Sequence, residues 1–441
     1  MAASFPRPFG FWQRWWPAGL ALFCLLVAAL ALRVSTGLGR ARSSPAGSDN
    51  ALLKSADLWP ETPAVLVPTL HLTGVVDAGK LRKALTRLHK CGQTNVSGLL
   101  HSLRLFGRDA AFVDPKTGRQ CPILRSLLDP ETGPAGSHGG TILIETREGV
   151  RCRPLRGDEL RLTGVPEQDN ARETHEHQLL SVLAELGVRA DHPLRVRAGV
   201  RLVRDMLTDA LATFDPAQAE VEWSALAFAL YLPPSNAWTD KYGRHRDFDK
   251  LAGELMRRPF RAQGCGGTHL LYSLAALYQV DQHHRVLTSA VRGAVRKYLA
   301  NVVGRLAETQ LPCGAWVSRW EARQAPDLGL AGQGAAPDGD LLVTGHHVEW
   351  MLLLPTDLLP PRDCFIRAAR WLEMRLSNTP ADELARLYCP YSHAARVLTL
   401  MGGVPRNLVK GMACEPSRNR PRPKSIGVGE ADHRWERLRN R

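Results

Sequence analysis

A predicted helix over residues 344–354 carries three side chains that together could do acid–base chemistry. His346, Glu349 and Trp350 are spaced i, i+3 and i+4, so they share one face of the helix. A carboxylate beside an imidazole orients the ring and raises its basicity, which suits a general acid–base pair. The neighbouring indole could stack on a sugar ring or an isoprenoid chain.

A second predicted helix starts after Thr268, which is a plausible N-cap residue, and brings another imidazole. His269 falls in its first turn, with Tyr272 on the same side. The candidate catalytic residues are therefore His346, Glu349 and His269. The candidate substrate-binding residues are Trp316, Trp350 and Tyr272. The alternative is structural: these polar groups cap helix ends, Thr344 being the second expected N-cap, and hydrogen-bond to one another.

Metal binding and glycoside cleavage are weaker alternatives. Zinc prefers thiolate and imidazole ligands, and the residues that could supply them are Cys265, His269, Cys313 and His346. Their spacing matches no zinc motif, so no metal is assigned. Glycoside cleavage would use two carboxylates. Glu321, Asp338, Asp340 and Glu349 are available, but their spacing selects no pair.

The elements that must position these residues are mostly helices. Apolar residues recur at helical spacing through most of the chain after residue 169 and in two earlier segments. The predicted helices are 78–90, 95–106, 173–186, 193–214, 217–232, 248–256, 268–279, 285–309, 344–354, 362–376 and 382–401, the last broken at Cys389-Pro390. Residues 133–164 form the one β-like stretch, with strands at 141–145 and 150–155 and a third at 160–162.

The amino-terminal segment is long and apolar enough to be a membrane anchor. Residues 15–32 carry no charged side chain, which suffices to span the hydrocarbon core. Trp15 and Trp16 stand where interfacial aromatic residues are placed. A cleaved signal peptide is the rival interpretation, but Ala29-Leu30-Ala31 lies inside the apolar run and Arg33 follows at once. We expect a single-pass membrane protein whose main domain is extracytoplasmic.

The chain of 441 residues has a net charge of +14, from 57 Lys and Arg against 43 Asp and Glu. The basic excess gathers at the two ends of the chain, so we expect a solvated tail and no nucleic-acid binding. The expected partners are the lipid bilayer, through residues 15–32, and an envelope carbohydrate or protein. The nine cysteines form no CxxC pair, which favours small buried side chains over a disulfide framework.

One motif points to a known family. Gln310, Gly314 and Trp316 match Gln-x-x-x-Gly-x-Trp after a predicted long helix. Residues 177–187, 222–227, 265–272 and 344–350 extend the likeness. The chain resembles membrane-anchored bacterial proteins of the planctomycete type that are similar to the squalene cyclase/prenyltransferase-like α/α-toroid family. The resemblance implies a mainly α fold, an incomplete barrel of helix pairs with a small β-hairpin-like insertion, and a membrane anchor. It implies no particular reaction.

The catalytic acid motif of the class II terpene cyclases in that family is missing. The nearest strings to its Asp-x-Asp-Asp acid are Asp247-Phe248-Asp249 and Asp338-Gly339-Asp340, and neither supplies it. We therefore expect a non-catalytic binding or scaffold module. The alternative is a transferase, lyase or hydrolase acting on a carbohydrate or isoprenoid at the toroid rim. The expected organisation is a cytoplasmic stub (1–14), the anchor (15–32), a flexible linker (33–50), a helical part (51–132), the β-like insertion (133–164), the toroid domain (165–412) and a basic, disordered tail (413–441).

Overall fold

The computed structural model describes residues 62–91, 95–113, 118–129, 142–152, 175–232, 237–260, 264–322 and 337–402. The expected stub, membrane anchor, linker and basic tail lie outside these ranges, as does the expected third strand at 160–162. In the part of the chain that is described, no helix has the length and apolarity needed to cross a membrane. The described part is mainly helical, with small antiparallel hairpins.

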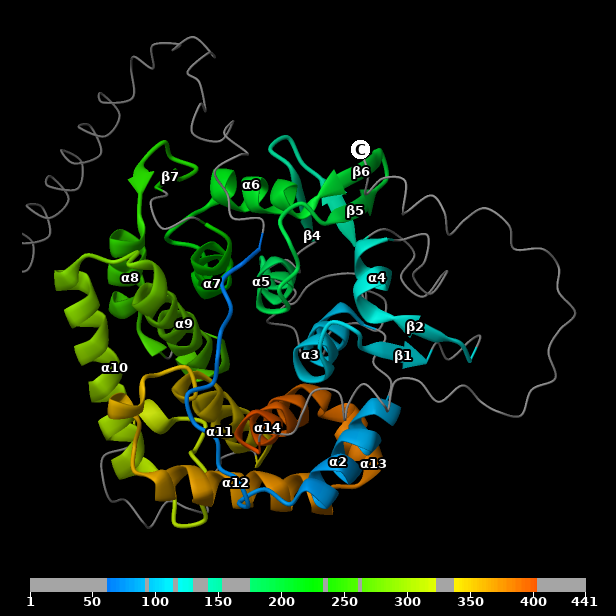
Figure 1. The fold of residues 1–441 in the computed structure, drawn as a ribbon, viewed down its shortest axis with the longest axis vertical. Helices are drawn as coiled ribbons and strands as arrows, with labels where there is room; N and C mark the ends of the chain where they lie inside the picture. The colour runs from blue at the N-terminus through cyan, green and yellow to red at the C-terminus, as the bar shows by residue number, and fades with distance from the viewer. Residues whose placement is uncertain are drawn as a thin grey trace, which may run out of the picture. The chain divides into compact units, whose positions relative to one another are not determined.

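Within the described ranges, six helices pack in a closed order, each against the next and the last against the first (Figure 1). We call them the helix ring: α3 (Val96–Phe106), α5 (Gln178–Glu185), α7 (Val221–Tyr231), α9 (Thr268–His284), α11 (Pro337–Met351) and α14 (Tyr388–Met401). Helix α7 shows why such helices are central, because every one of its residues is buried. A helix that is apolar on all sides needs neighbours all round it.

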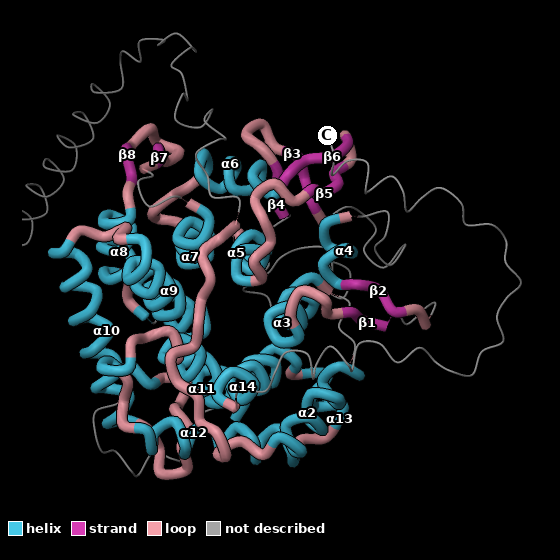
Figure 2. Tube along the Cα trace, viewed as in Figure 1, coloured by secondary structure: helices cyan, strands magenta, loops and turns pink. Residues whose placement is uncertain are grey.

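Further helices pack on the outside of the helix ring (Figures 1 and 2). They are α2 (Ala78–Lys90), α4 (Ile123–Leu128), α6 (Val203–Thr213), α8 (Phe248–Arg257), α10 (Ser289–Thr309), α12 (Arg362–Asn378) and α13 (Ala381–Arg386). Helix α10 is amphipathic, since its buried side chains include Val295, Leu299, Val302 and Leu306 on one stripe. A single buried stripe places a helix at the surface.

The β structure consists of four two-stranded antiparallel hairpins in the described residues. Their strands are β1 (Ala111–Val113) with β2 (Gln120–Pro122), β3 (Leu143–Glu145) with β4 (Val150–Cys152), β5 (Pro193–Val196) with β6 (Gly199–Leu202), and β7 (Trp238–Thr239) with β8 (His245–Arg246). The hairpin β3–β4 falls in the expected β-like stretch. The expectation that this stretch is the only one was wrong.

The helix predicted over residues 193–214 was wrong in its first ten residues. Leu194 and Val196 are buried while their neighbours are not, which is the alternation of a strand. Gly199 has φ +139, which allows the chain to turn back into β6. Helix α6 therefore begins only at Val203.

Several helix boundaries also differ from the prediction, and three of them bear on expected caps or breaks. Thr268 is the first residue of α9, and Gly267 is its N-cap. Thr344 is not an N-cap, because α11 starts at Pro337 and includes it. Its hydroxyl instead accepts a hydrogen bond from the backbone N–H of Trp316 at 2.9 Å. The break expected at Cys389-Pro390 occurs at Leu387, between α13 and α14. Pro390 falls in the first turn of α14, where a missing N–H costs little.

The turn after α10 is built as its motif predicts. Gly314 has φ +100, and a Cβ there would stand 2.3 Å from the backbone oxygen of Arg367. Gln310 closes the turn by donating to the backbone oxygens of Gly314 at 2.9 Å and Cys364 at 2.8 Å. Trp316 is buried and donates its indole N–H to Leu306 O at 2.8 Å. The motif therefore joins α10 to α12.

An extended segment, residues 62–72, crosses one end of the helix ring, and we call it the strap (Figure 1). Its backbone amides donate to carbonyls at or just after the carboxyl ends of three ring helices. The bonds are Ala64 N to Leu230 O at 2.8 Å, Thr69 N to Leu352 O at 2.8 Å and Leu72 N to Met401 O at 2.7 Å. The strap thus ties α7, α11 and α14 together at that end.

Candidate functional site

The interior of the helix ring holds a network of ion pairs. Arg104 on α3 donates to Glu185 on α5 at 2.9 Å. Arg396 on α14 contacts both Glu185, at 3.1 Å, and Glu349 on α11, at 3.0 Å. The hydroxyl of Tyr272 on α9 also donates to Glu185. Five of the six ring helices therefore meet through charged or polar side chains. These side chains and His393 form what we call the polar centre: Arg104, Glu185, Tyr272, Glu349, His393 and Arg396.

The charges of the polar centre are fixed by this pairing. Burial alone would raise the pKa of Glu349, but His393 and Arg396 hold that pKa well below its usual range. Burial acts in the same direction on Glu185, but Arg104, Arg396 and the Tyr272 hydroxyl together outweigh it, so the pKa of Glu185 is lowered too. Both carboxylates are therefore ionised, and the two arginines balance them.

Two histidines approach Glu349, His346 from the same helix α11 and His393 from the neighbouring helix α14. His346 Nδ1 lies 3.4 Å from Oε2, and His393 Nδ1 lies 3.0 Å from Oε1. The two imidazole rings have centroids 3.8 Å apart. Burial, with a smaller contribution from the neighbouring His393, lowers the pKa of His346 to about 3. His346 is thus a neutral imidazole whose Nε2 atom is buried without a hydrogen-bond partner.

His269 extends this row of rings toward the amino-terminal end of α9. Its centroid lies 4.9 Å from that of His346. Trp223, at 4.8 Å, and His175, at 5.1 Å, contact it on other sides. His175 in turn pairs with the carboxylate of Glu220. The Nδ1 atom of His269 is buried and makes no hydrogen bond, so two neighbouring histidines keep a nitrogen available for a ligand.

The segment before α9 brings a cysteine to the same region. Cys265, Gly266 and Gly267 all have positive φ, at +51, +64 and +79. A Cβ on Gly267 would lie 2.6 Å from the ring of Phe260. A left-handed cysteine is strained, and such strain persists only where the surrounding structure enforces it. The result is that Cys265 joins His269 and His346 in a group whose ligand atoms lie within 4.8 Å of one another.

Four groups in the described residues have the composition and spacing of metal ligands. They are Cys265 with His269 and His346, His101 with Cys389 and His393, His175 with Glu220 and His269, and His346 with Glu349 and His393. Their donors suit zinc better than magnesium or calcium, because each of the four groups contains two imidazoles and two of the groups also contain a thiol.

The predicted site residues divide into two sets. His346, Glu349, His269 and Tyr272 converge inside the helix ring, with Cys265 beside them. Trp316 and Trp350 lie apart from these residues and contact His347, whose ring centroid is 5.7 Å from Trp316 and 6.3 Å from Trp350. Both indoles are buried, and the N–H of Trp350 donates to His347 Nδ1 at 3.1 Å. Cys313 is exposed and belongs to none of the four groups.

Several residues of the polar centre and of the candidate metal groups were not predicted: His101, Arg104, Glu185, Cys389, His393 and Arg396. Two of them had a signal in the sequence, because Cys389 and His393 are four residues apart and share a face of α14. The others come one or two from each helix and meet only because the helix ring closes.

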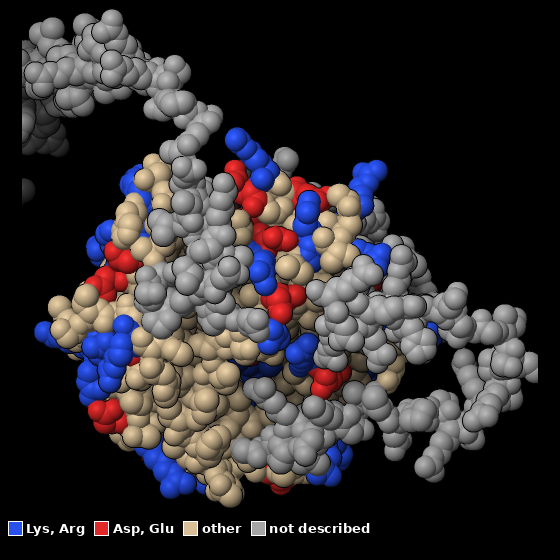
Figure 3. Space-filling model, turned by 45° about the horizontal axis from the view of Figure 1, so that its top comes forward, with Lys and Arg blue, Asp and Glu red and all other residues tan. Residues whose placement is uncertain are grey.

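The outer surface gives fewer indications of function than the interior does. On the face drawn in Figure 3, basic and acidic side chains are interspersed among the described residues. Comparison of the chain with protein-family models, with curated proteins and with solved structures found no match.

Proposed function

We propose that the helix ring is an α/α toroid and that the polar centre inside it, together with the adjoining His346 and His269, is an active site for acid–base chemistry on a carbohydrate. The closed order of the six ring helices, with other helices outside, supports the toroid. It also agrees with the Gln310–Gly314–Trp316 turn, which joins an outer helix to its neighbour as the resemblance implies. Residues 15–32 would anchor this domain to the membrane, with the domain outside the cytoplasm.

The observation that carries the proposed activity is the convergence of His346, Glu349 and His269. A set of residues that only capped helix ends would be spread over the ends of their own helices. These three lie side by side, and two of the imidazoles have unpartnered buried nitrogens. In the proposed site, His346 Nε2 takes a proton from the substrate, Glu349 orients the ring through Nδ1, and His269 binds beside it.

The composition of the polar centre favours a carbohydrate over an isoprenoid. A hydrocarbon chain placed against two arginines and two carboxylates would remove their remaining water and give no hydrogen bonds in return. Hydroxyl groups can both donate and accept in such a site. Arg396 keeps 15% of its side chain exposed, so the network is not sealed from solvent.

A substrate panel tests this proposal on the full-length chain. Neutral and acidic oligosaccharides form one arm and isoprenyl diphosphates the other, with products detected by mass spectrometry. Turnover of a saccharide that His346→Gln abolishes, and that the exposed-site variant His283→Asn retains, is the expected result. Turnover of isoprenyl diphosphates alone would show that the substrate is an isoprenoid and not a carbohydrate. If no substrate is turned over and no saccharide binds, the proposed activity is wrong and the non-catalytic binding or scaffold module is the better interpretation.

A further inference from the structure

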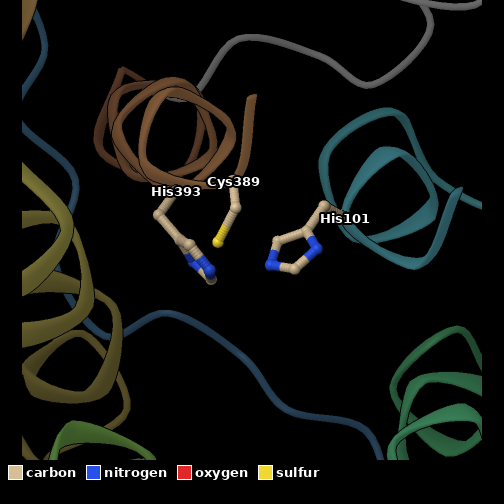
Figure 4. Close-up of side chains that lie close together, drawn as sticks. All are labelled: His101, Cys389 and His393. Atoms are coloured by element: carbon tan, nitrogen blue, oxygen red, sulfur yellow. The ribbon is translucent and has the colours of Figure 1, made fainter. Parts of the chain in front are cut away.

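A second group of donors lies inside the helix ring, between α3 and α14. The ligand atoms of His101, Cys389 and His393 all lie within 4.8 Å of one another, and the thiol sits between the two imidazoles (Figure 4). Zinc bonds of 2.0 to 2.3 Å place tetrahedral ligands about 3.3 to 3.6 Å apart. Small side-chain rotations would bring the three atoms to that separation.

The two histidines are already held in the tautomer that a metal requires. His101 Nδ1 lies 2.7 Å from the backbone oxygen of Ser97, and His393 Nδ1 lies 3.0 Å from Glu349 Oε1. A carbonyl and a carboxylate can only accept, so each Nδ1 carries the proton. Each Nε2 therefore keeps its lone pair. A histidine ligand that donates its other ring nitrogen to a carbonyl or carboxylate is the usual arrangement in protein metal sites.

We propose that His101, Cys389 and His393 bind a zinc ion inside the helix ring. One thiolate and two imidazoles are the donors that zinc prefers, and they disfavour magnesium and calcium. Three protein ligands leave one position for water or substrate, which is the pattern of catalytic rather than structural zinc.

The rival group, Cys265 with His269 and His346, is less prepared for a metal. His269 Nδ1 has no partner that would fix its tautomer. His346 Nδ1 approaches Glu349 at 3.4 Å, farther than His393 does. We therefore assign the zinc ion to His101, Cys389 and His393, between α3 and α14. This assignment does not depend on whether the polar centre turns over a carbohydrate.

The test uses the full-length chain, purified without added metal and then loaded with Zn²⁺ alone or Co²⁺ alone. The expected results are about one ion per chain by elemental analysis and a thiolate-to-cobalt absorption band. Cys389→Ser should remove the band, and His393→Gln should weaken binding by more than 100-fold. Glu349→Gln should weaken it by about 10- to 100-fold, because His393 loses its orienting acceptor. Cys313→Ser, at an exposed cysteine, is the matched control and should change nothing.

Two results would overturn the proposal. One is a wild-type chain that gives no cobalt–thiolate band. The other is a band that survives Cys389→Ser and disappears in Cys265→Ser, which would move the ion to the rival group. Circular dichroism of each metal-free variant checks folding. If Cys389→Ser does not fold, His101→Gln takes its place, and the expected result is a loss of bound metal measured by elemental analysis. Because no substrate is used, failure of the proposed activity cannot be mistaken for failure of the metal site.

Discussion

Arg396 on α14 lies against Glu349 on α11, with Nη1 3.0 Å from Oε1. The same guanidinium reaches Glu185 through Nη2 at 3.1 Å. One arginine thus joins two buried carboxylates from helices that are far apart in sequence. Burying such charges costs several kcal/mol for each ion, and the pairing offsets that cost only while every partner is present. The polar centre is therefore a sensitive point of the fold as well as a candidate site.

Replacing Arg396 by Met should destabilise the protein strongly. The change leaves Glu185 with Arg104 alone and removes the closest cation of Glu349. Loss of one partner from a buried ion pair costs about 3 to 5 kcal/mol. Urea unfolding would measure this loss against Arg370→Met, which removes an exposed arginine from α12. Equal unfolding free energies for the two variants would contradict the ion network described above.

Glu222 predicts a pH dependence of stability. Both of its carboxylate oxygens are buried without a partner, and burial raises its pKa from 4.5 to about 7. The native state therefore holds this proton more tightly than the unfolded state does. The stabilisation is complete below pH 4.5 and is lost as the pH rises through 7, by about 3 kcal/mol in total.

Glu222→Gln should cancel that loss. Its unfolding free energy should match that of the wild type near pH 4 and exceed it by up to about 3 kcal/mol at pH 8. Denaturant unfolding at both pH values measures the difference. Glu308→Gln, at an exposed position of α10, is the control and should show no such divergence. If the difference in unfolding free energy between the wild type and Glu222→Gln is the same at pH 4 and at pH 8, the carboxyl group of Glu222 is not protonated in the native state.

The motif glycine predicts a steric effect. A Cβ at Gly314 would stand 2.3 Å from the backbone oxygen of Arg367, and φ is +100. Neither the backbone of α12 nor the turn can move cheaply, so Gly314→Ala should cost about 3 kcal/mol or more. Gly304→Ala, on the open side of α10, should instead stabilise by about 0.5 to 1 kcal/mol. Thermal unfolding of the two variants shows whether the turn is as tight as described.

The sequence predicted the helices better than it predicted the site. Helix α2 was predicted with its observed bounds, because Leu81, Leu85 and Leu88 form an unambiguous stripe. The first strand pair after Pro193 was missed, since four or five alternating residues resemble the start of an amphipathic helix. Short strands carry too few residues for the two periods to be told apart.

Half of the candidate site had a local signal and half did not. His346 and Glu349 share a helix face, so their contact follows from spacing alone. Arg104, Glu185 and Arg396 meet across three helices, and only the closure of the ring makes them neighbours. A single arginine on an otherwise apolar helix gives no sign of its partner. Such contacts are properties of the tertiary fold, and no spacing rule within one helix could reveal them.

One side chain adds three hydrogen bonds to the backbone bonds that hold the strap, and it acts as a clamp on Val67. Gln279 on α9 accepts from Val67 N at 2.9 Å and donates to Val67 O at 2.7 Å and Leu353 O at 3.1 Å. Gln279→Leu removes all three bonds and leaves the Leu353 carbonyl without this donor. We expect a loss of about 1 to 3 kcal/mol of local stability. Hydrogen exchange of residues 63–72 should accelerate while that of α9 stays unchanged, and Gln282→Leu, at an exposed position on α9, should leave both unaffected. If hydrogen exchange in the strap is the same in Gln279→Leu as in the wild type, the other hydrogen bonds of the strap are sufficient to hold it against the helix ring.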